Sequence, residues 1–228
     1  MKYKAAIDLS GQEATFAVAD LINGKIIFEE YCKMGRRDSS SLTPWMLSCL
    51  GKSNIDLSSI IEWTVGIGPG SFTGMRMASA LISGVTFGKK DIASKGVPTA
   101  LAFAASLNSD SGDAIAVLYD GRNKELLMFG AENANDKIRA TGAASAFAQD
   151  KASEALSGFR LFAAWEKDRE SIEKIIHPEI AARVKYFEHL PVAELLSENI
   201  DSVGFDMTEL VYIRPAVFVE PIKTRKVV

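Results

Sequence analysis

The order of predicted elements in the first third of the chain constrains the fold most. Asn23 and Gly24 form a strong hairpin signal between two β-prone runs, and Thr43 with Pro44 is a good start for a helix. The predicted elements are strands at residues 4–8, 15–19, 25–31 and 63–68 and helices at about 43–50 and 72–87. This order predicts an antiparallel meander of three strands, then a helix that crosses to a fourth strand, and therefore an α/β protein.

This order resembles the opening of the ribonuclease-H-like core, which is duplicated in actin, Hsp70 and sugar kinases. The resemblance implies an actin-like (ASKHA) fold with two subdomains, and 228 residues suffice for one large core or two small ones. We expect an N-terminal ribonuclease-H-like subdomain at 1–105, which carries a glycine-rich turn and two partner helices. A C-terminal subdomain of related topology is expected at 106–228.

The second half of the chain carries more diffuse signals. Pro98 would open a linking helix, and the polar residues 108–113 precede a predicted hairpin. The expected elements are helices at 99–106, 143–156, 168–176 and 191–198 and strands at 114–119, 125–129, 160–164 and 184–187. Because no sequence repeat is visible, the two halves would have to share a topology without sharing residues.

A glycine-rich segment, Gly66 to Gly74, joins the fourth predicted strand to the long helix. Such glycines suit a tight turn or a close backbone approach, and Ser71 and Thr73 would cap a helix end that attracts anions. The spacing matches neither GxGxxG nor GxxxxGK[ST], so neither dinucleotide nor P-loop chemistry follows. A phosphate cradle and a packed structural turn both remain open. The candidate phosphate-loop-like residues are Asp8, Ser10, Gly66, Gly68, Gly70, Ser71 and Thr73.

Asp8, at the end of the first predicted strand, admits two interpretations. In kinases and ATPases of the actin-like fold, an acid at this place binds magnesium or water beside the nucleotide, and Asp120 would be the matching acid of the second half. This gives a rival function: a small ATP-dependent kinase or ATPase that uses Asp8, Ser10 and the Gly66–Gly74 turn. The alternative is that Asp8 caps the turn that contains Gly11 and that Asp120 belongs to a plain hairpin.

The long predicted helix is apolar or small on nearly every side, with Arg76 as its only charge before Lys89. Such a helix needs cover on both faces. The helix at 43–50 is similarly broad, so the two would leave an apolar strip of the kind that marks an interface, unless the second domain covers it. The candidate partner-interface residues are Leu42, Trp45, Met46, Met75, Arg76, Ala78, Ser79 and Ile82.

Several segments resemble the TsaB (YeaZ) family. The signature is Gly66-Ile67-Gly68-Pro69-Gly70-Ser71-Phe72-Thr73-Gly74 followed by Met-Arg-Met. The similar segments elsewhere are Asp8-Leu9-Ser10, Asp120-Gly121-Arg122 with Glu125-Leu126, and Val211-Tyr212-Ile213-Arg214. The likeness spans the chain from end to end, although Leu9 replaces the family's threonine and residues 37–41 lack a histidine often found ahead of the first helix.

The resemblance implies a non-catalytic scaffold or activator subunit in the synthesis of tRNA N6-threonylcarbamoyladenosine. In that family TsaB uses the two helices to pair with TsaD, which transfers the threonylcarbamoyl group to an adenosine next to the anticodon. The ATPase TsaE takes part as well, and TsaB alone forms homodimers. The expected partners are therefore TsaD, TsaE and a second copy, with tRNA met only indirectly. ATP or ADP at the partner interface stays an open alternative.

Composition points to a cytoplasmic protein that does not grip tRNA alone. The net charge is −3, whereas an independent tRNA binder usually carries a basic excess. The single basic cluster is Lys223, Arg225 and Lys226, which we interpret as a solvated tail. No apolar run suits a signal peptide or a membrane span, and Cys32 and Cys49 stand alone, as in a reducing compartment.

No catalytic or metal site is expected. The two histidines, His177 and His189, lack the His-x-x-x-His spacing that aims two imidazoles at one ion, so surface or capping roles are predicted. GxSxG is absent, and a serine or cysteine nucleophile would lack a base. An interpretation as a metalloprotease therefore fails for want of ligands.

Overall fold

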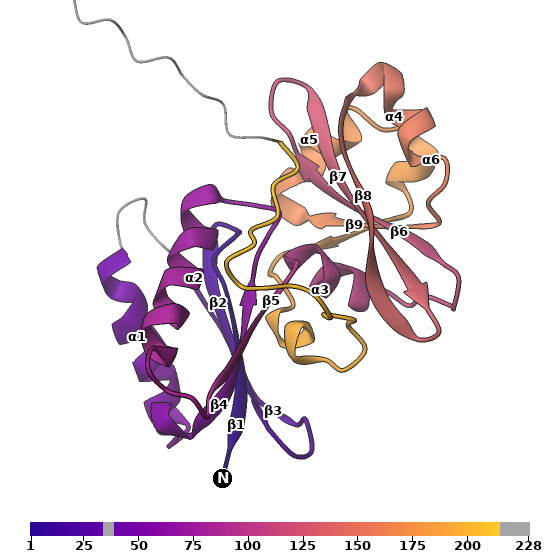
Figure 1. The fold of residues 1–228 in the computed structure, drawn as a ribbon. Coiled ribbons are helices and arrows are strands. Elements are labelled where there is room, and N and C mark those ends of the chain that lie inside the picture. Colours follow the sequence, from indigo (N-terminus) through magenta and orange to yellow (C-terminus); the bar gives the residue numbers. More distant parts are fainter. Residues whose placement is uncertain (34–38, 215–228) are drawn as a thin grey trace, which may run out of the picture.

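Two five-stranded sheets, one from each half of the chain, organise the protein (Figure 1). The computed structural model describes residues 1–33 and 39–214. The first sheet has the order β3-β2-β1-β4-β5, with β1 (Tyr3–Asp8), β2 (Glu13–Asp20), β3 (Ile26–Lys33), β4 (Ile60–Gly66) and β5 (Ala93–Val97). β2 pairs antiparallel with β1 and β3, whereas β4 pairs parallel with β1 and β5. The predicted meander and helical crossover are confirmed.

The second sheet repeats this topology with unrelated residues. Its order is β10-β9-β6-β7-β8, with β6 (Ala114–Asp120), β7 (Glu125–Ala134), β8 (Lys137–Ala148), β9 (Leu161–Trp165) and β10 (Val184–Phe187). β7 is antiparallel to β6 and β8, and β9 is parallel to β6 and β10. Read from the meander edge, both sheets therefore have the strand order 3-2-1-4-5, so β6 is the counterpart of β1.

Helices cover the sheets and fill the space between them (Figure 1). The helices are α1 (Ser39–Lys52), α2 (Phe72–Thr86), α3 (Thr99–Ala105), α4 (Gln149–Leu156), α5 (Arg169–Glu173) and α6 (Pro178–Ala181), with short 3₁₀ turns η1 (Leu57–Ser59), η2 (Glu166–Asp168) and η3 (Val192–Leu196). We call the first sheet with α1 and α2 the first lobe, and the second sheet with α4, α5 and α6 the second lobe. None of the helices in the described ranges has the length and apolar character that crossing a bilayer requires.

The alternating faces of β1 explain the layering. Ala5 and Ile7 pack under α1 and α2 with Phe16 and Trp63, while Ala6 faces a core shared by both lobes. That shared core contains α3, whose residues Thr99 to Ala104 are fully buried. A third cluster lies beneath α4, α5 and α6.

The end of the described chain returns to the first lobe. η3 packs on β1 and β2, and the amide of Gly96 donates to the carbonyl of Phe205 over 3.3 Å. The division at 105/106 falls between α3 and β6. It stays a prediction, and residues 190–214 lie partly against the first sheet rather than with the second lobe alone.

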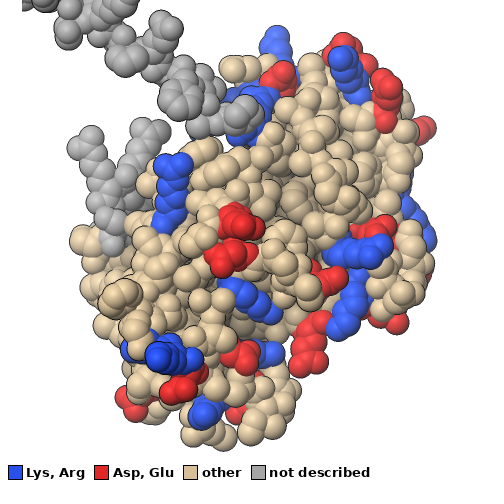
Figure 2. Space-filling view, in the orientation of Figure 1, with Lys and Arg blue, Asp and Glu red and all other residues tan. Residues whose placement is uncertain are grey.

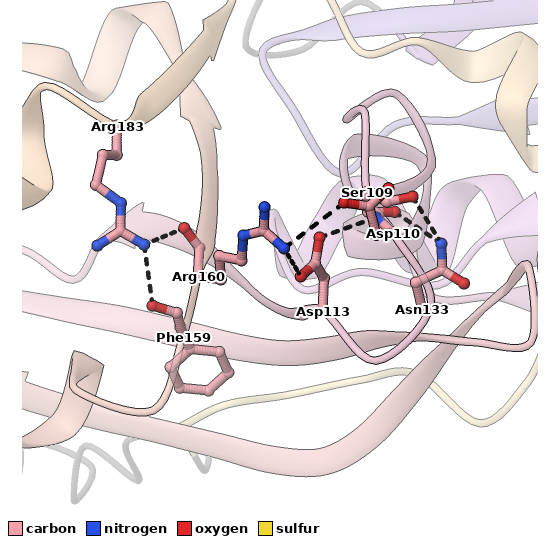
Figure 3. A network of polar contacts seen from close by, with 7 residues as sticks. All are labelled: Ser109, Asp110, Asp113, Asn133, Phe159, Arg160 and Arg183. Atoms are coloured by element: carbon pink, nitrogen blue, oxygen red, sulfur yellow. Dashed lines mark hydrogen bonds and ion pairs between the residues drawn. The ribbon is translucent and has the colours of Figure 1, made fainter.

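A polar network braces the second lobe where β6 and β9 begin (Figure 3). The Nη1 atom of Arg160 donates to Oδ1 of the buried Asp113 over 2.7 Å, and the amide of Asp110 donates to the other carboxylate oxygen over 2.9 Å. Arg183 donates to the backbone carbonyls of Phe159 and Arg160. These bonds join the turn before β6 and the segment before β10 to the start of β9, and so serve the fold.

Three predicted helices differ from the structure, and one strand was missed. α1 begins at Ser39 rather than Thr43, so Pro44 lies inside the helix, where it removes one backbone hydrogen bond. β5 went unpredicted because its residues do not alternate and it is a short strand at the sheet edge. The predicted helix 143–156 is wrong in its first half, since pairing of β8 with β7 overrides the helix preference of alanine. The helix predicted at 191–198 is the 3₁₀ turn η3.

Candidate functional site

A cavity of about 890 Å³ lies between the two lobes, at the ends of β1, β6 and β9. Its lining residues are Ser10, Gly11, Gln12, Pro69, Gly70, Ser71, Phe72, Tyr119, Asp120, Gly121, Arg122, Leu127, Trp165, Lys167, Asp168, Val211, Tyr212, Ile213 and Arg214. The first lobe contributes uncharged residues to this wall, whereas the second lobe contributes two acids and two bases. The cleft is therefore chemically asymmetric.

The side chain of Asp8 is held by hydrogen bonds inside the first lobe. It is buried, and Oδ1 accepts hydrogen bonds from the amide and the hydroxyl of Ser10, each over 2.7 Å. Oδ2 accepts from the Thr99 hydroxyl over 2.5 Å, and Thr99 in turn accepts from the Gly68 amide over 3.0 Å. Burial raises the pKa of the carboxyl even though these donors oppose the shift. Asp8 thus caps its own turn and is not among the residues that line the described cavity.

The glycine-rich turn packs against the turn that follows β1. A Cβ atom at Gly66 would lie 1.8 Å from Oδ2 of Asp8, and one at Gly74 would lie 1.8 Å from the carbonyl oxygen of Leu9. The amide of Ser71 also donates to the carbonyl of Ser10 over 2.7 Å. Gly74 therefore lets two backbones touch, and Gly66 leaves room for the Asp8 side chain, as the structural alternative of the two that the sequence left open requires.

The predicted phosphate-loop-like residues separate into two groups. Ser10, Gly70 and Ser71 line the cavity, and Ser71 caps α2 by accepting from the amide of Gly74 over 3.3 Å. Asp8, Gly66 and Gly68 lie buried behind them, and Thr73 is exposed. What reaches the cavity from the first lobe is therefore a capped helix end and a serine hydroxyl that already bonds Asp8.

The second lobe supplies the charged wall. Asp120 is exposed at the end of β6, and its Oδ1 accepts from the amide of Arg122 over 2.8 Å. The amide of Asp120 donates to Oδ2 of Asp168 over 3.4 Å, and burial raises the pKa of Asp168. Lys167 lies over the Trp165 ring, 4.8 Å from its centroid.

Sequence reasoning found Asp120 but missed Lys167 and Asp168. Both lie in η2, within three residues of the end of a buried strand, β9, which is parallel to β6. Because parallel strands end at the same edge of a sheet, a polar pair after such a strand was the available signal.

The burial of residues in α1 and α2 corrects the set of candidate partner-interface residues. The buried residues are Leu42, Met46, Met75, Ala78, Ser79 and Ile82. Of these, Leu42, Met46, Ala78 and Ile82 belong to the core of the first lobe. They cannot touch a partner while the core is intact. Of the eight candidates, Trp45 is half-buried and Arg76 is exposed, so only these two are open to contact.

The exposed side of α2 carries different residues. They are Thr73, Arg76, Ala80, Gly84 and, just beyond the helix, Phe87, whose exposed fraction is 87%. Leu47 on α1 is 45% exposed. We call Thr73, Arg76, Ala80, Gly84 and Phe87 the outer strip, and its helical residues include a single charge, that of Arg76. Over α1 and α2, Figure 2 shows mostly uncharged surface, and no second-lobe element covers it in Figure 1.

The two histidines have separate structural roles. His177 caps α6, with Nδ1 accepting from the amide of Glu179 over 3.4 Å, as predicted. His189 instead joins the lobes: it stacks on Tyr31 with ring centroids 4.4 Å apart, and its Nδ1 lies 2.8 Å from Oε2 of Glu13. Among residues 1–33 and 39–214, no three His, Cys, Asp or Glu side chains gather as a metal site requires. Lys223, Arg225 and Lys226 lie outside the described residues.

Comparisons with known proteins agree with this topology. A protein-family model described as "TsaD: tRNA N6-adenosine threonylcarbamoyltransferase" matches residues 33–191. YeaZ from Pseudomonas aeruginosa has 20% sequence identity and a TM-score of 0.65, with 86% of this chain and 89% of that chain covered. No curated protein matches the sequence.

A second solved structure gives the same result. It is described as "an uncharacterized protein with similarity to peptidase YEAZ from Pseudomonas aeruginosa", with 20% identity and a TM-score of 0.67 over 94% of this chain and 100% of that chain. At this identity the likeness shows a common fold. The predicted α/β architecture of two subdomains is therefore confirmed, and the chain shares its fold with these YeaZ structures.

Proposed function

This chain belongs to the TsaD family, tRNA N6-adenosine threonylcarbamoyltransferase, and we propose that it is a non-catalytic scaffold or activator subunit of the TsaB (YeaZ) kind. Its partner would be a TsaD-like transferase subunit, which acts on tRNA in the cytoplasm. A TsaE-like ATPase would join the larger complex, and a second copy of the chain would occupy the same surface when the partner is absent.

The observation that carries the proposal is the outer strip. Ala80 and Gly84 are exposed, and a Cβ built at Gly84 meets no heavy atom within 4 Å. Small residues at this spacing let the backbone of another helix approach closely, and Phe87 and Leu47 add apolar area beside them. An exposed strip that is mostly uncharged, with Arg76 as the one charge on its helical part, is typical of a protein-protein contact.

The state of Asp8 supports an accessory role. Its carboxylate oxygens already accept three hydrogen bonds from protein groups, so it is poorly placed to bind magnesium. The net charge of −3 also fits a subunit that meets tRNA through its partner.

Mixing the chain with a TsaD subunit and measuring the mass by multi-angle light scattering tests the proposal. We expect a heterocomplex that competes with self-association. The absence of any complex at low and moderate salt would remove the scaffold function.

The rival function, a small ATP-dependent kinase or ATPase, now depends on the second lobe. Asp120 and Asp168 lie together on the wall of the cavity that Ser71 also lines, and two carboxylates with a phosphate can hold magnesium. Calorimetry with magnesium-ATP decides this point. Micromolar binding by the free chain that is lost in Asp120→Ala would favour the rival over the scaffold.

A further inference from the structure

A strap, residues 205–214, crosses from the first lobe to the second, drawn in yellow in Figure 1. It is fastened to the first sheet by the Gly96 amide, which donates to Phe205, and by the Val211 amide, which donates to the carbonyl of Ile67 over 2.8 Å. Val211 and Ile213 pack on the shared core. The strap is therefore a fixed element of the fold and not a loose connection.

The strap also contacts the start of α2. Tyr212 stacks on Phe72, the first residue of α2, with ring centroids 4.0 Å apart and an interplanar angle of 19°. The guanidinium of Arg76 lies 4.9 Å from the centroid of the Phe72 ring. Because Arg76 is part of the outer strip, a continuous stack leads from the surface of α2 to the strap.

Two residues further on, the strap holds the turn between β6 and β7. Nη1 of Arg214 donates to the carbonyl of Gly121 over 3.0 Å, and Nη2 pairs with Glu125. The amide of Gly121 donates to the carbonyl of Glu125 over 2.9 Å, which closes the turn. A Cβ at Gly121 would lie 2.8 Å from that carbonyl and 3.4 Å from Nη2 of Arg214, so the guanidinium is packed directly on the turn.

We propose that the strap couples the outer strip of α2 to the β6–β7 turn, so that docking on α2 changes how firmly the second lobe's wall of the cleft is held. The stack at Tyr212 and the clamp at Arg214 restrain the same short segment, and loosening one end therefore loosens the other. Such coupling is reciprocal in free energy. The inference rests on the proposed function only for the identity of the docking partner, because the coupling is a property of the free chain.

Hydrogen exchange on the free, full-length chain tests the coupling. In Phe72→Leu the ring stack is lost, and we expect amide exchange at residues 121–125 to become about tenfold faster. Phe87→Leu is the matched control, since it makes the same change at an exposed residue just beyond the other end of α2. In this variant the amides of residues 121–125 should exchange as in the wild type. Wild-type exchange rates at 121–125 in Phe72→Leu would overturn the proposal.

Arg214→Gln tests the same coupling from the side of the β6–β7 turn. It also tests the proposal if Phe72→Leu does not fold. It removes the guanidinium clamp without touching α2. We expect faster exchange both at 121–125 and at the Met75 amide in the first turn of α2. Faster exchange at the β6–β7 turn alone would show that the two ends are independent and would overturn the proposal.

A third arm adds saturating TsaD subunit. In the wild type we expect slower exchange at 121–125 on binding, and in Phe72→Leu this effect should disappear. Binding that leaves the wild-type turn unchanged would overturn the coupling. If the subunit does not bind, the proposed function fails, while the two free-chain comparisons still decide the coupling.

Discussion

The two lobes end their equivalent strands on the same residue type in opposite environments. Asp8 closes β1 and Asp120 closes β6, and each accepts a hydrogen bond from the amide two residues later. Asp8 is buried and bonded to Thr99 as well, whereas Asp120 is exposed and faces the cleft. The same topological position is thus a buried, structural aspartate in the first lobe and an exposed aspartate that faces the cavity in the second.

The cause of the difference is the chain that follows each parallel strand. After β4 the glycine-rich turn presses against the turn at Asp8 and leaves no space for a ligand there. After β9, residues Lys167 and Asp168 keep their side chains on the cleft wall. In the first lobe the Gly66–Gly74 turn therefore packs on Asp8 and positions the start of α2. In the second lobe the equivalent segment leaves the charged side chains facing the cavity.

The largest expected effect is steric and lies in the first lobe. Gly74→Ala would place a Cβ 1.8 Å from the Leu9 carbonyl, and we expect the free energy of unfolding to fall by at least about 3 kcal/mol. Gly84→Ala, in the same helix but with open space around it, should instead raise stability by up to about 1 kcal/mol. Urea unfolding measures both. Equal effects would mean that the two turns do not touch as described.

The next largest expected effect is a difference in stability between variants of Asp8 and of Asp120. Asp8→Ala leaves the buried amide of Ser10 and the hydroxyl of Thr99 without an acceptor, and we expect a loss of about 3 kcal/mol. Asp120→Ala removes one exposed bond and should cost about 0.5 kcal/mol. Chemical denaturation of the two variants compares them directly, and a similar loss in both would remove the contrast between the lobes.

The smallest expected effect is the part of the pH dependence of stability that comes from Asp8. Burial raises its pKa from the ordinary value of 3.8, so the native protein keeps this proton to higher pH than the unfolded chain does. The stabilisation is complete below 3.8 and is lost as the pH rises through the raised native pKa. The stability of the wild type relative to Asp8→Asn should therefore fall as the pH rises above 3.8 in urea titrations. A rise over that range would contradict the sign.

The sequence predicts the fold better than it predicts the site. Hairpin signals, the Thr43-Pro44 helix signal and the Gly66–Gly74 segment were enough for β1 to β4 and for the existence of α1 and α2, because these are local rules, whereas the edge strand β5 was missed. β8 was misread, since the alanines at 143–148 become a strand only through pairing with β7. The face of α2 was also misjudged: Ala78 and Ala80 look alike in sequence, and only packing against the sheet buries the first and leaves the second exposed.

Pairing through the outer strip is the central claim, and one light-scattering series tests it most directly. Ala80→Arg places a charge at the centre of the strip, while Ser153→Arg places the same charge on an exposed position of α4. Both chains should stay folded by circular dichroism. We predict that Ser153→Arg forms the complex with a TsaD subunit as the wild type does and that Ala80→Arg does not. A complex of wild-type mass with Ala80→Arg would contradict the account.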